Sequence, residues 1–383
     1  MQSLKQGDSG LKAWPVLAIV FIEAILFLAH WFIYRTLVVF WGNLGPTATV
    51  ALRDALFLLA FSFIVAALLS FNFSNWLVTA IYKIAAVWLG FLNFFFLAAC
   101  LSWLANLALL LSPLAPTLPH LRPFIAATLF ILALLAGIYG LLNARWIRIR
   151  HVPVNLPNLP QSWRGRRALL VSDLHLGHVN GLGFSRRIAR LAARLHPDVV
   201  FLPGDLFDGT KSAPDRLAAP FKQLSPPFGI YYSTGNHDEF GDAAQHTAAL
   251  TRAGIRVLAN EKVTVDGLQI LAVAYGDSTY PLRLRTALED LHLNRGQASI
   301  LLNHVPNRLP LVEQAGVSLQ LSGHTHGGQL FPFTWLIRRV FGKFTYGLQR
   351  FGALQVYTSS GAGTWGPPMR VGTHAEIVLL QFE

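Results

Sequence analysis

The stretch Ala168-Leu169-Leu170-Val171-Ser172-Asp173-Leu174-His175 is a short apolar run that ends in two side chains able to bind a metal ion. Four later segments repeat this plan of an apolar run followed by a polar motif. They are Gly204-Asp205, Gly235-Asn236-His237-Asp238, Asn303-His304 and Gly323-His324-Thr325-His326. Each motif alone is common, and H-x-H by itself is a weak metal signal. Together, in this order, the motifs indicate a metal-dependent hydrolase.

The C-terminal half alternates short β-branched runs with amphipathic segments and turns. The pattern predicts strands at 168–172, 198–202, 230–234, 270–274, 299–302 and 317–321, and helices at 184–195 and 242–252. Such alternation is typical of an α/β domain. Each polar motif begins where a predicted strand stops, which is where α/β sheets bind their ligands. We therefore expect the motifs to meet in space.

In this order the motifs resemble those of the calcineurin-like metallophosphoesterase superfamily. The later segments Ser359-Ser360-Gly361-Ala362-Gly363-Thr364 and Pro367-Pro368-Met369-Arg370 resemble a membrane-associated phosphodiesterase branch of it, and the resemblance covers residues 163–383. It implies an α/β/β/α sandwich and a binuclear metal centre bridged by Asp205. The first ion is expected on Asp173, His175, Asp205 and His326. The second ion is expected on Asp205, Asn236, His304 and His324. The resemblance also implies that His237 is the general acid and that Asp238 orients it.

Hydrolysis of a phosphate ester needs a hydroxide near neutral pH and neutralisation of the phosphoryl charge. Two divalent ions about 3.5 to 4 Å apart provide both. Imidazole, carboxylate and amide ligands suit manganese, iron or zinc better than calcium, and we expect manganese. The only cysteine, Cys100, lies in the apolar N-terminal part, which excludes a thiolate site. Seven histidines outside the metal motifs and the first apolar stretch have no motif around them and are expected to be structural or exposed, with His178 the nearest to the site. They are His120, His151, His178, His196, His246, His292 and His374.

The composition is too apolar for an ordinary soluble enzyme, because 53% of the 383 residues are hydrophobic and 13% are charged. Residues 14–34, 55–71 and 123–143 are apolar stretches of the length that spans a bilayer. Residues 76–112 are long for one span and short for two. We interpret them as one span over about 84–107, with 76–82 in the membrane interface. The sequence thus predicts a helical transmembrane domain at 1–145, with about four helices, before a phosphoesterase domain at 151–383.

Basic residues after the last span predict the orientation. Arg145, Arg148 and Arg150, followed by three more arginines at 164–167, place the C-terminal domain in the cytoplasm by the positive-inside rule. Lys5, Lys12 and Lys83 agree with this orientation, whereas Arg35 and Arg53 do not. We expect a multi-pass protein of the inner (plasma) membrane. The net charge of +12 indicates anionic lipid and a phosphate-ester substrate as partners, rather than nucleic acid.

The segment 331–343 combines aromatic and basic residues just after the last metal motif. This composition is typical of a segment lying in a bilayer interface, and the alternative is a loop whose apolar residues pack on their own domain. The predicted function is a membrane-anchored two-metal phosphoesterase acting on a lipid or lipid-linked phosphate through a metal-bound hydroxide. One narrower alternative is the UDP-2,3-diacylglucosamine pyrophosphate hydrolase of lipid A synthesis. Another is a non-catalytic scaffold or transporter with a vestigial site, although no ligand position is missing.

Overall fold

The computed structural model describes residues 13–42, 44–240 and 242–383, and Lys5 and Lys12 lie outside them. The chain forms two compact units. The helical unit comprises Met1–Leu68 and Phe91–Leu135, and the sheet unit comprises Leu69–Gly90 and Ala136–Glu383. The start of helix α3 (Trp76–Leu110) and the end of helix α4 (Leu118–Arg145) therefore belong to the same compact unit as the strands.

Among the residues that the structure describes, four helices are long and apolar enough to cross a membrane, as the sequence predicted. They are α1 (Ala13–Trp41), α2 (Pro46–Asn72), α3 (Trp76–Leu110) and α4 (Leu118–Arg145), with a short 3-10 helix η1 (Ala115–Thr117) before α4. The stretch that was long for one span and short for two forms one helix, α3, of 35 residues. We expected residues 76–82 to lie in the membrane interface. They form the first turns of α3, where Val78 and Tyr82 are buried, and their place in the interface stays a prediction.

The sheet unit contains two six-stranded sheets. In spatial order, the first holds β1 (Arg148–Val154), β12 (Glu376–Phe382), β2 (Arg167–Leu170), β3 (Val199–Pro203), β4 (Ile230–Ser233) and β5 (Arg256–Val257). The second holds β10 (Gly347–Phe351), β11 (Leu354–Thr358), β9 (Leu319–Ser322), β8 (Ser299–Leu302), β7 (Leu268–Ala272) and β6 (Glu261–Val265). Strands β2 to β5 are mutually parallel, as are β7, β8, β9 and β11. All six predicted strands are present.

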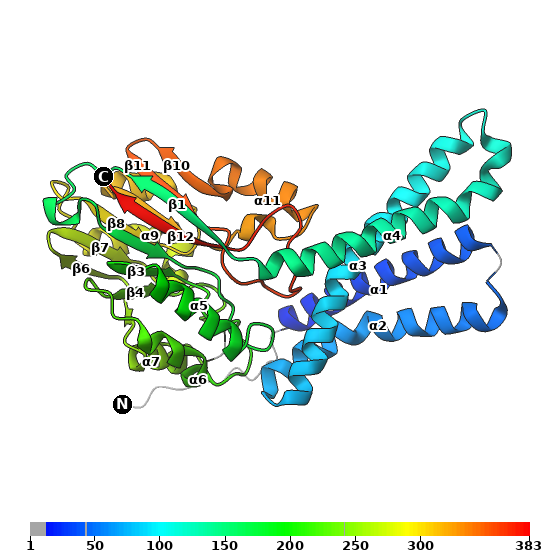
Figure 1. The fold of residues 1–383 in the computed structure, drawn as a ribbon, viewed down its shortest axis with the longest axis horizontal. Helices are drawn as coiled ribbons and strands as arrows, with labels where there is room; N and C mark the ends of the chain where they lie inside the picture. Colours follow the sequence, from blue (N-terminus) through cyan, green and yellow to red (C-terminus); the bar gives the residue numbers. More distant parts are fainter. Residues whose placement is uncertain (1–12, 43, 241) are drawn as a thin grey trace, which may run out of the picture. The chain divides into compact units, whose positions relative to one another are not determined.

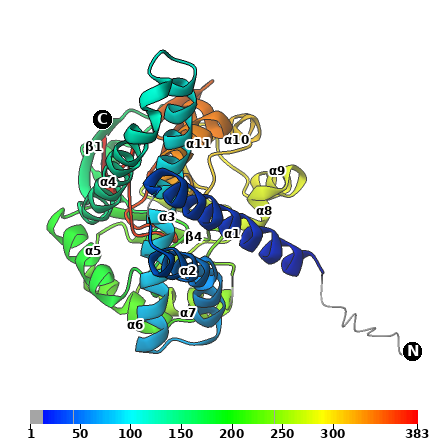
Figure 2. The same cartoon turned by 90° about the vertical axis from the view of Figure 1, so that its right-hand side faces the viewer.

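Helices cover the outer face of each sheet. Helices α5 (Leu182–Arg194), α6 (Pro214–Ala218) and α7 (Ala243–Arg252), with the 3-10 helix η3 (Ala219–Gln223), pack on the first sheet. Helices α9 (Pro281–Asp290) and α10 (Leu309–Ala315) pack on the second. Figure 2 shows α5 and α9 on opposite sides of the strands. The remaining elements are η2 (Gln161–Trp163), α8 (Tyr275–Thr279), η4 (His326–Gly328), α11 (Phe333–Phe341) and η5 (Gly342–Thr345).

A core between the two sheets holds them face to face. Its buried side chains include Phe201 of the first sheet and Ile300 of the second, together with Trp163 from η2. Both faces of each sheet are therefore covered, which explains why strands such as β3 and β8 are apolar at nearly every position. This arrangement confirms the predicted α/β/β/α sandwich.

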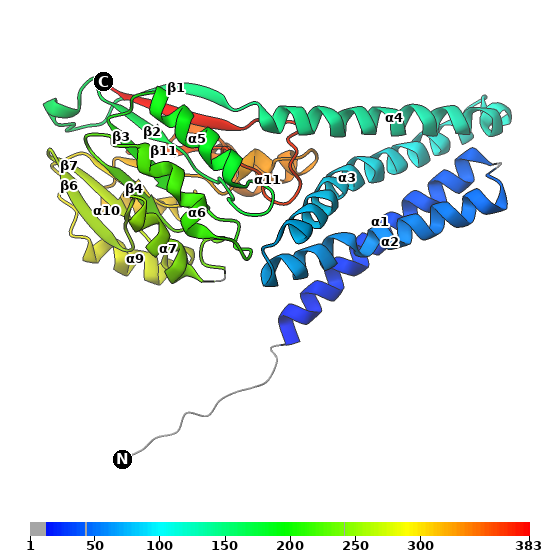
Figure 3. The ribbon, with the colours of Figure 1, turned by 60° about the horizontal axis from the view of Figure 1, so that its bottom comes forward.

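Strand β1 spans the boundary between the two predicted domains, 1–145 and 151–383. It pairs in parallel with β12, with Arg148 opposite Glu376, at the edge of the first sheet (Figure 1). Figure 3 shows β1 following directly from the end of α4. Pro153 is tolerated because an edge strand needs hydrogen bonds on one side only. Its partner β12 is the last strand in the sequence, so no local pattern predicted that β1 would be a strand.

Candidate metal centre

The polar motifs all follow the carboxyl ends of strands. Asp173 comes after β2, Asp205 directly after β3, and Asn236 and His237 after β4 in the first sheet. In the second sheet His304 follows β8, and His324 and His326 follow β9. Parallel strands end at the same edge of a sheet, so the fold brings these side chains together.

Three side chains of the first predicted ligand set form one buried group. The Nε2 atoms of His175 and His326 are 3.0 Å apart, and His326 Nε2 lies 3.6 Å from Asp173 Oδ1. Asp173, His175 and His326 each offer a ligand atom within 4.8 Å of the others. Their imidazoles and carboxylate can therefore hold one ion.

The second predicted set gathers around His304. Its Nε2 atom lies 3.2 Å from Asp205 Oδ2 and 4.0 Å from Asp173 Oδ1. The imidazole of His324 packs against His304, with ring centroids 5.2 Å apart, and its Nδ1 lies 3.0 Å from Asn236 Oδ1. All four members, Asp205, Asn236, His304 and His324, thus lie together.

Asp205 connects the two groups. Its Oδ2 atom is 3.6 Å from His175 Nε2 on one side and 3.2 Å from His304 Nε2 on the other. A carboxylate in this position can contribute to both ion sites, which is the arrangement expected of a bridging ligand.

The bonding of the buried atoms fits divalent cations. Asp173 Oδ2 is buried and has no hydrogen-bond partner, and the buried His304 Nε2 makes no hydrogen bond of good geometry, with Asp205 Oδ2 at 3.2 Å. A buried polar atom without a partner lowers the stability of the fold, and a bound metal ion would accept the electron pairs of these two atoms. His304 Nδ1 is bound to the carbonyl oxygen of Pro203 at 2.8 Å, which fixes the ring so that Nε2 faces the carboxylates. Binding of the second ring nitrogen to a backbone carbonyl is common among metal-binding histidines.

The electrostatics differ from one side chain to the next. Burial raises the pKa of Asp173 to about 6 and lowers the pKa of His175 to about 3. Burial opposes the charged form of His304, but the attraction of Asp205 raises its pKa to about 10. Burial also opposes ionisation of Asp205, yet His304 lowers its pKa below the ordinary value. Asp205 and His304 therefore form an ion pair in the absence of metal.

The ligand loops have unusual backbone conformations. Positive φ angles occur at Asp173, His175, Asp205, His324 and His326, between 45° and 69°. Such conformations cost on the order of 1–3 kcal/mol each for residues other than glycine, and they cluster at functional sites. Gly204 has φ +88°, and a Cβ there would lie 2.5 Å from His304 Nδ1. The glycine of the G-D motif therefore lets the histidine approach the Asp205 loop.

His237 lies beside the first group. Its Nδ1 atom donates to the carbonyl oxygen of Asp208 at 3.1 Å, and its ring centroid lies 4.8 Å from that of His175. His237, His175 and Asp205 also offer ligand atoms within 4.8 Å of one another. The backbone N–H of His237 donates to Asp205 Oδ1 at 2.9 Å. The predicted acid therefore reaches the centre.

Asp238 does not orient His237, contrary to our expectation. Its carboxylate accepts backbone N–H groups of Asp205 at 2.6 Å, Gly235 at 2.9 Å and Phe207 at 3.0 Å. These N–H groups belong to two adjacent loops, and they occupy the Asp238 carboxylate that we had expected to bind the His237 imidazole. Asp238 therefore fixes the backbone that carries the Asp205 carboxylate, and the carbonyl group of Asp208 orients His237.

The sequence analysis missed the role of Arg370. This fully buried side chain donates to the carbonyl oxygens of Ser360 at 2.7 Å, Gly361 at 3.1 Å and Gly363 at 2.6 Å. Its Nη2 lies 3.4 Å from His326 Nδ1. The motif containing Arg370 was visible in the sequence, but nothing local indicated that its side chain would turn back toward His326.

Two other histidines are buried rather than exposed. His246 stacks on Phe207 with ring centroids 4.6 Å apart and binds the carbonyl of Asp238 at 3.1 Å. His178 bonds to Thr79 of α3 through Nδ1 at 2.9 Å. His246 thus has the expected structural role, while His178 joins the loop that follows His175 to α3.

Comparisons with known proteins agree with this geometry. Residues 166–328 match the model of the calcineurin-like phosphoesterase family. The chain is 34% identical to a transmembrane protein with metallophosphoesterase domain from Danio rerio, covering 65% of this chain and 60% of that protein. It is 31% identical to an uncharacterized metallophosphoesterase of Campylobacter jejuni, covering 61% of this chain and 63% of that protein. The chain thus spans less than two thirds of both relatives.

An uncharacterized metallophosphoesterase of Aquifex aeolicus is matched over nearly its whole length. It is 30% identical to this chain, and the alignment covers 65% of the chain and 97% of that protein. The family match over residues 166–328 includes the motifs, and the structure brings their side chains together at the strand ends. With its four membrane-length helices, this membrane protein belongs to the calcineurin-like phosphoesterase family.

Proposed function

We propose that this protein is a membrane-anchored, two-metal-dependent phosphoesterase that hydrolyses a phosphate ester of a lipid or lipid-linked substrate. The observation that carries the proposal is the place of Asp205, whose Oδ2 lies within 3.6 Å of His175 and 3.2 Å of His304. A scaffold with a vestigial site would not need a complete ligand set around that carboxylate.

The side chains divide the chemistry between them. When bound, divalent ions supply charge neutralisation for the phosphoryl group and lower the pKa of water. Asp173, His175 and His326 would hold one ion, and Asn236, His304 and His324 the other, with Asp205 shared. His237 holds its Nδ1 proton against the Asp208 carbonyl, which leaves Nε2 to donate a proton to the leaving oxygen.

Manganese is the ion we propose, with iron or zinc as the alternatives. The ligands are imidazole nitrogens, carboxylate oxygens and one amide oxygen. Ligands of intermediate softness suit first-row transition ions better than calcium, which prefers six to eight oxygen ligands. The raised pKa of His304, about 10, means that an ion must displace a proton from this ligand at neutral pH.

Helix α11 supports a lipid-linked substrate. None of its residues is buried, and Trp335 and Val340 are 58% and 66% exposed. Arg339 lies over the Trp335 ring at 4.8 Å, and Arg338 is also in the last turn. The alternative, a loop packed on its own domain, does not fit a helix without buried residues. Exposed apolar side chains beside arginines suit a bilayer interface with anionic headgroups.

The same helix is adjacent to the metal centre. The ring of Phe341, the last residue of α11, lies 6.2 Å from the ring of His324. A headgroup bound along α11 would therefore be near the proposed second ion. We further propose that the phosphoesterase domain faces the cytoplasm at the inner (plasma) membrane, because the arginine cluster at 145–150 follows the last span.

Chelation tests the metal-dependent chemistry. Full-length protein in detergent, stripped with a chelator, should lose hydrolysis of bis(p-nitrophenyl) phosphate and regain it with manganese. Asp205→Asn should stay inactive after manganese is added, because a neutral amide cannot bridge two cations. Activity that survives chelation, or an active Asp205→Asn protein, would refute the proposal.

Substitutions on α11 test the lipid substrate. Trp335→Ser combined with Val340→Ser should reduce hydrolysis of phospholipid in anionic vesicles while leaving the soluble ester unaffected. Leu282→Ser is the matched control, since Leu282 is a 74% exposed apolar residue on α9. Equal rates for the α11 variant and the control on vesicles would remove the support that α11 gives to a lipid substrate.

A further inference from the structure

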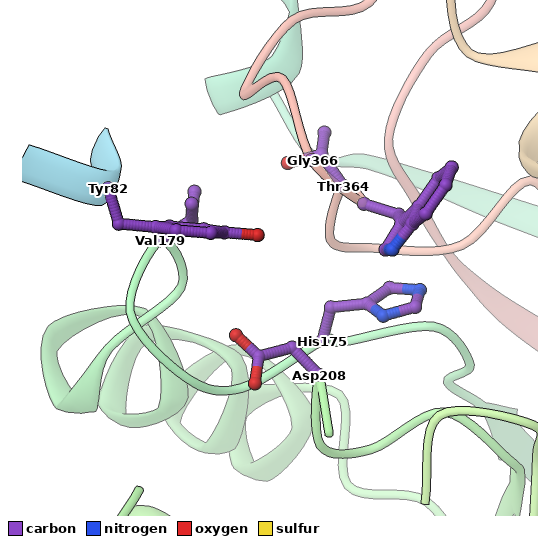
Figure 4. Close-up of a pocket in the computed structure, with 7 residues that line it drawn as sticks. Tyr82, His175, Val179, Asp208, Thr364 and Gly366 are labelled. Carbon is purple, nitrogen blue, oxygen red and sulfur yellow. The ribbon is translucent and has the colours of Figure 1, made fainter. Parts of the chain in front are cut away.

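A pocket lies beside the candidate metal centre, within the sheet unit. Its lining includes Tyr82, His175, Asp208, Thr364, Trp365 and Gly366. Figure 4 shows the Tyr82 hydroxyl pointing into the pocket and the Asp208 carboxyl turned to the side of Tyr82 and Val179. The pocket is small and partly open to solvent, so it suits a small polar group. One wall is a metal-ligand histidine, and the opposite wall comes from α3.

Tyr82 is fixed in place through His178. The two rings pack with centroids 5.7 Å apart. The Nε2 atom of His178 donates to the Ser70 carbonyl at 3.4 Å, so its Nδ1 accepts the Thr79 hydroxyl at 2.9 Å. The segment around Tyr82 is thereby held against the loop that follows His175. A helix of membrane-spanning length thus supplies a polar side chain to the site.

Asp208 gives the pocket its charge preference. Its carboxylate accepts the backbone N–H and hydroxyl of Thr210 at 2.9 and 2.5 Å, and the backbone N–H of His178 at 3.3 Å. A carboxylate has about four acceptor positions, so a further donor can be bound. A hydroxyl or ammonium group satisfies that position, whereas a second phosphate or a carboxylate would be repelled.

Trp365 places the pocket on the leaving-group side. Its ring lies 5.6 Å from that of His237, the proposed acid. Gln329 holds its backbone by accepting the Trp365 N–H at 3.0 Å and donating to its carbonyl at 2.9 Å. The aromatic ring offers an apolar wall to a short carbon chain and a π face to an ammonium group.

From these contacts we infer that the pocket binds the alcohol moiety of the substrate, a small headgroup alcohol bearing a hydroxyl or ammonium donor. Tyr82 and Asp208 bind the donor, and Trp365 covers the carbon chain. This inference rests on the proposed function, because it assumes that the phosphate binds at the metal centre. It favours an ester of a neutral or cationic alcohol over a pyrophosphate bond, whose leaving group is anionic.

Binding of phosphates to manganese-loaded full-length protein in detergent tests the inference. The probes are inorganic phosphate, glycerol 3-phosphate, phosphoethanolamine and 3-phosphoglycerate, titrated by calorimetry. We expect glycerol 3-phosphate or phosphoethanolamine to bind about three- to tenfold more tightly than phosphate, the gain of about one hydrogen bond. The 3-phosphoglycerate probe, which has a carboxylate at the far end, should show no gain. Equal affinity for all four would overturn the inference.

The Tyr82→Phe substitution identifies the residue responsible. It keeps the ring that packs on His178 and removes only the hydroxyl, so the ratio of headgroup-phosphate to phosphate affinity should fall about threefold or more. Tyr139→Phe, on the exposed side of α4, is the matched control and should keep the wild-type ratio. A ratio unchanged in Tyr82→Phe contradicts the assignment.

Hydrolysis assays separate this inference from the proposed function. If the protein prefers headgroup phosphates but hydrolyses no ester, the pocket inference stands and the proposed phosphoesterase function is refuted. If the protein hydrolyses the soluble ester in a metal-dependent way but binds all four phosphates equally, the proposed function stands and the pocket inference is refuted.

Discussion

The carboxylate of Asp238 accepts the backbone N–H of Asp205 at 2.6 Å, so one buried acid holds the loop that presents the other. The same carboxylate accepts the N–H groups of Phe207 and Gly235. Burial and the nearby Asp205 charge raise the pKa of Asp238 to about 7. The position of Asp205, the proposed bridging ligand, thus depends on a residue outside both proposed ligand sets.

Replacing Asp238 by Asn should reduce both stability and ion content. The amide has one acceptor oxygen for three N–H groups, so at least one buried donor loses its partner at a cost of about 1–3 kcal/mol. Thermal unfolding and metal analysis of the purified protein measure the two effects. Asp290→Asn, at an exposed position on α9, is the control. Wild-type manganese content in Asp238→Asn would contradict the role assigned to this carboxylate.

Replacing His237 by Gln should reduce turnover far more than ion binding. Loss of a general acid typically costs about 10²–10⁴-fold in rate. Manganese content should stay near the wild-type value, because both ion sites keep their ligands. Steady-state kinetics with metal analysis separates the effects, and His292→Gln, at an exposed histidine, is the control. If His237→Gln loses its ions instead, this residue is a ligand, as its approach to His175 and Asp205 would allow.

Ion binding should release protons at neutral pH. The pKa of His304 is raised to about 10, so in the ion-free protein this ligand is protonated at pH 7 and must lose its proton to bind metal. Apparent affinity should therefore rise with pH from 7 toward 10, with about one proton released from this residue. Titration calorimetry in buffers of different ionisation enthalpy counts the protons. Binding without proton release would contradict the His304 and Asp205 ion pair.

Replacing Arg370 by Met should destabilise the protein and weaken the ion site at His326. The carbonyl groups of Ser360, Gly361 and Gly363 would lose their buried donor, with an expected total cost above about 2 kcal/mol. Unfolding in detergent measures the loss, and Arg350→Met, at an exposed position on β10, is the control. Equal stability of the two variants would show that the carbonyl groups find other donors.

The sequence predicted the strands and the meeting of the motifs because both depend on local patterns. An apolar run followed by Asp173 or Asp205 places a ligand at a strand end, and parallel pairing brings the ends together. The roles of Asp238 and Arg370 depend on side-chain direction across loops, which spacing does not encode. Strand β1 was missed because it pairs with β12, more than two hundred residues later, with Arg148 opposite Glu376. Tyr82 was missed for the same reason, since its pocket is built from distant segments.

The shared compact unit of Leu69–Gly90 and Ala136–Glu383 bears on how the protein should be prepared. A truncated protein starting at β1 would leave His178 without Thr79 and would remove Tyr82 altogether. It would also uncover Met369, which packs against Gly90 and Gly140 of the removed helices. Rate constants from such a fragment would describe a damaged substrate site. Reconstitution of the whole chain in lipid nanodiscs is the preparation that preserves every wall of the pocket.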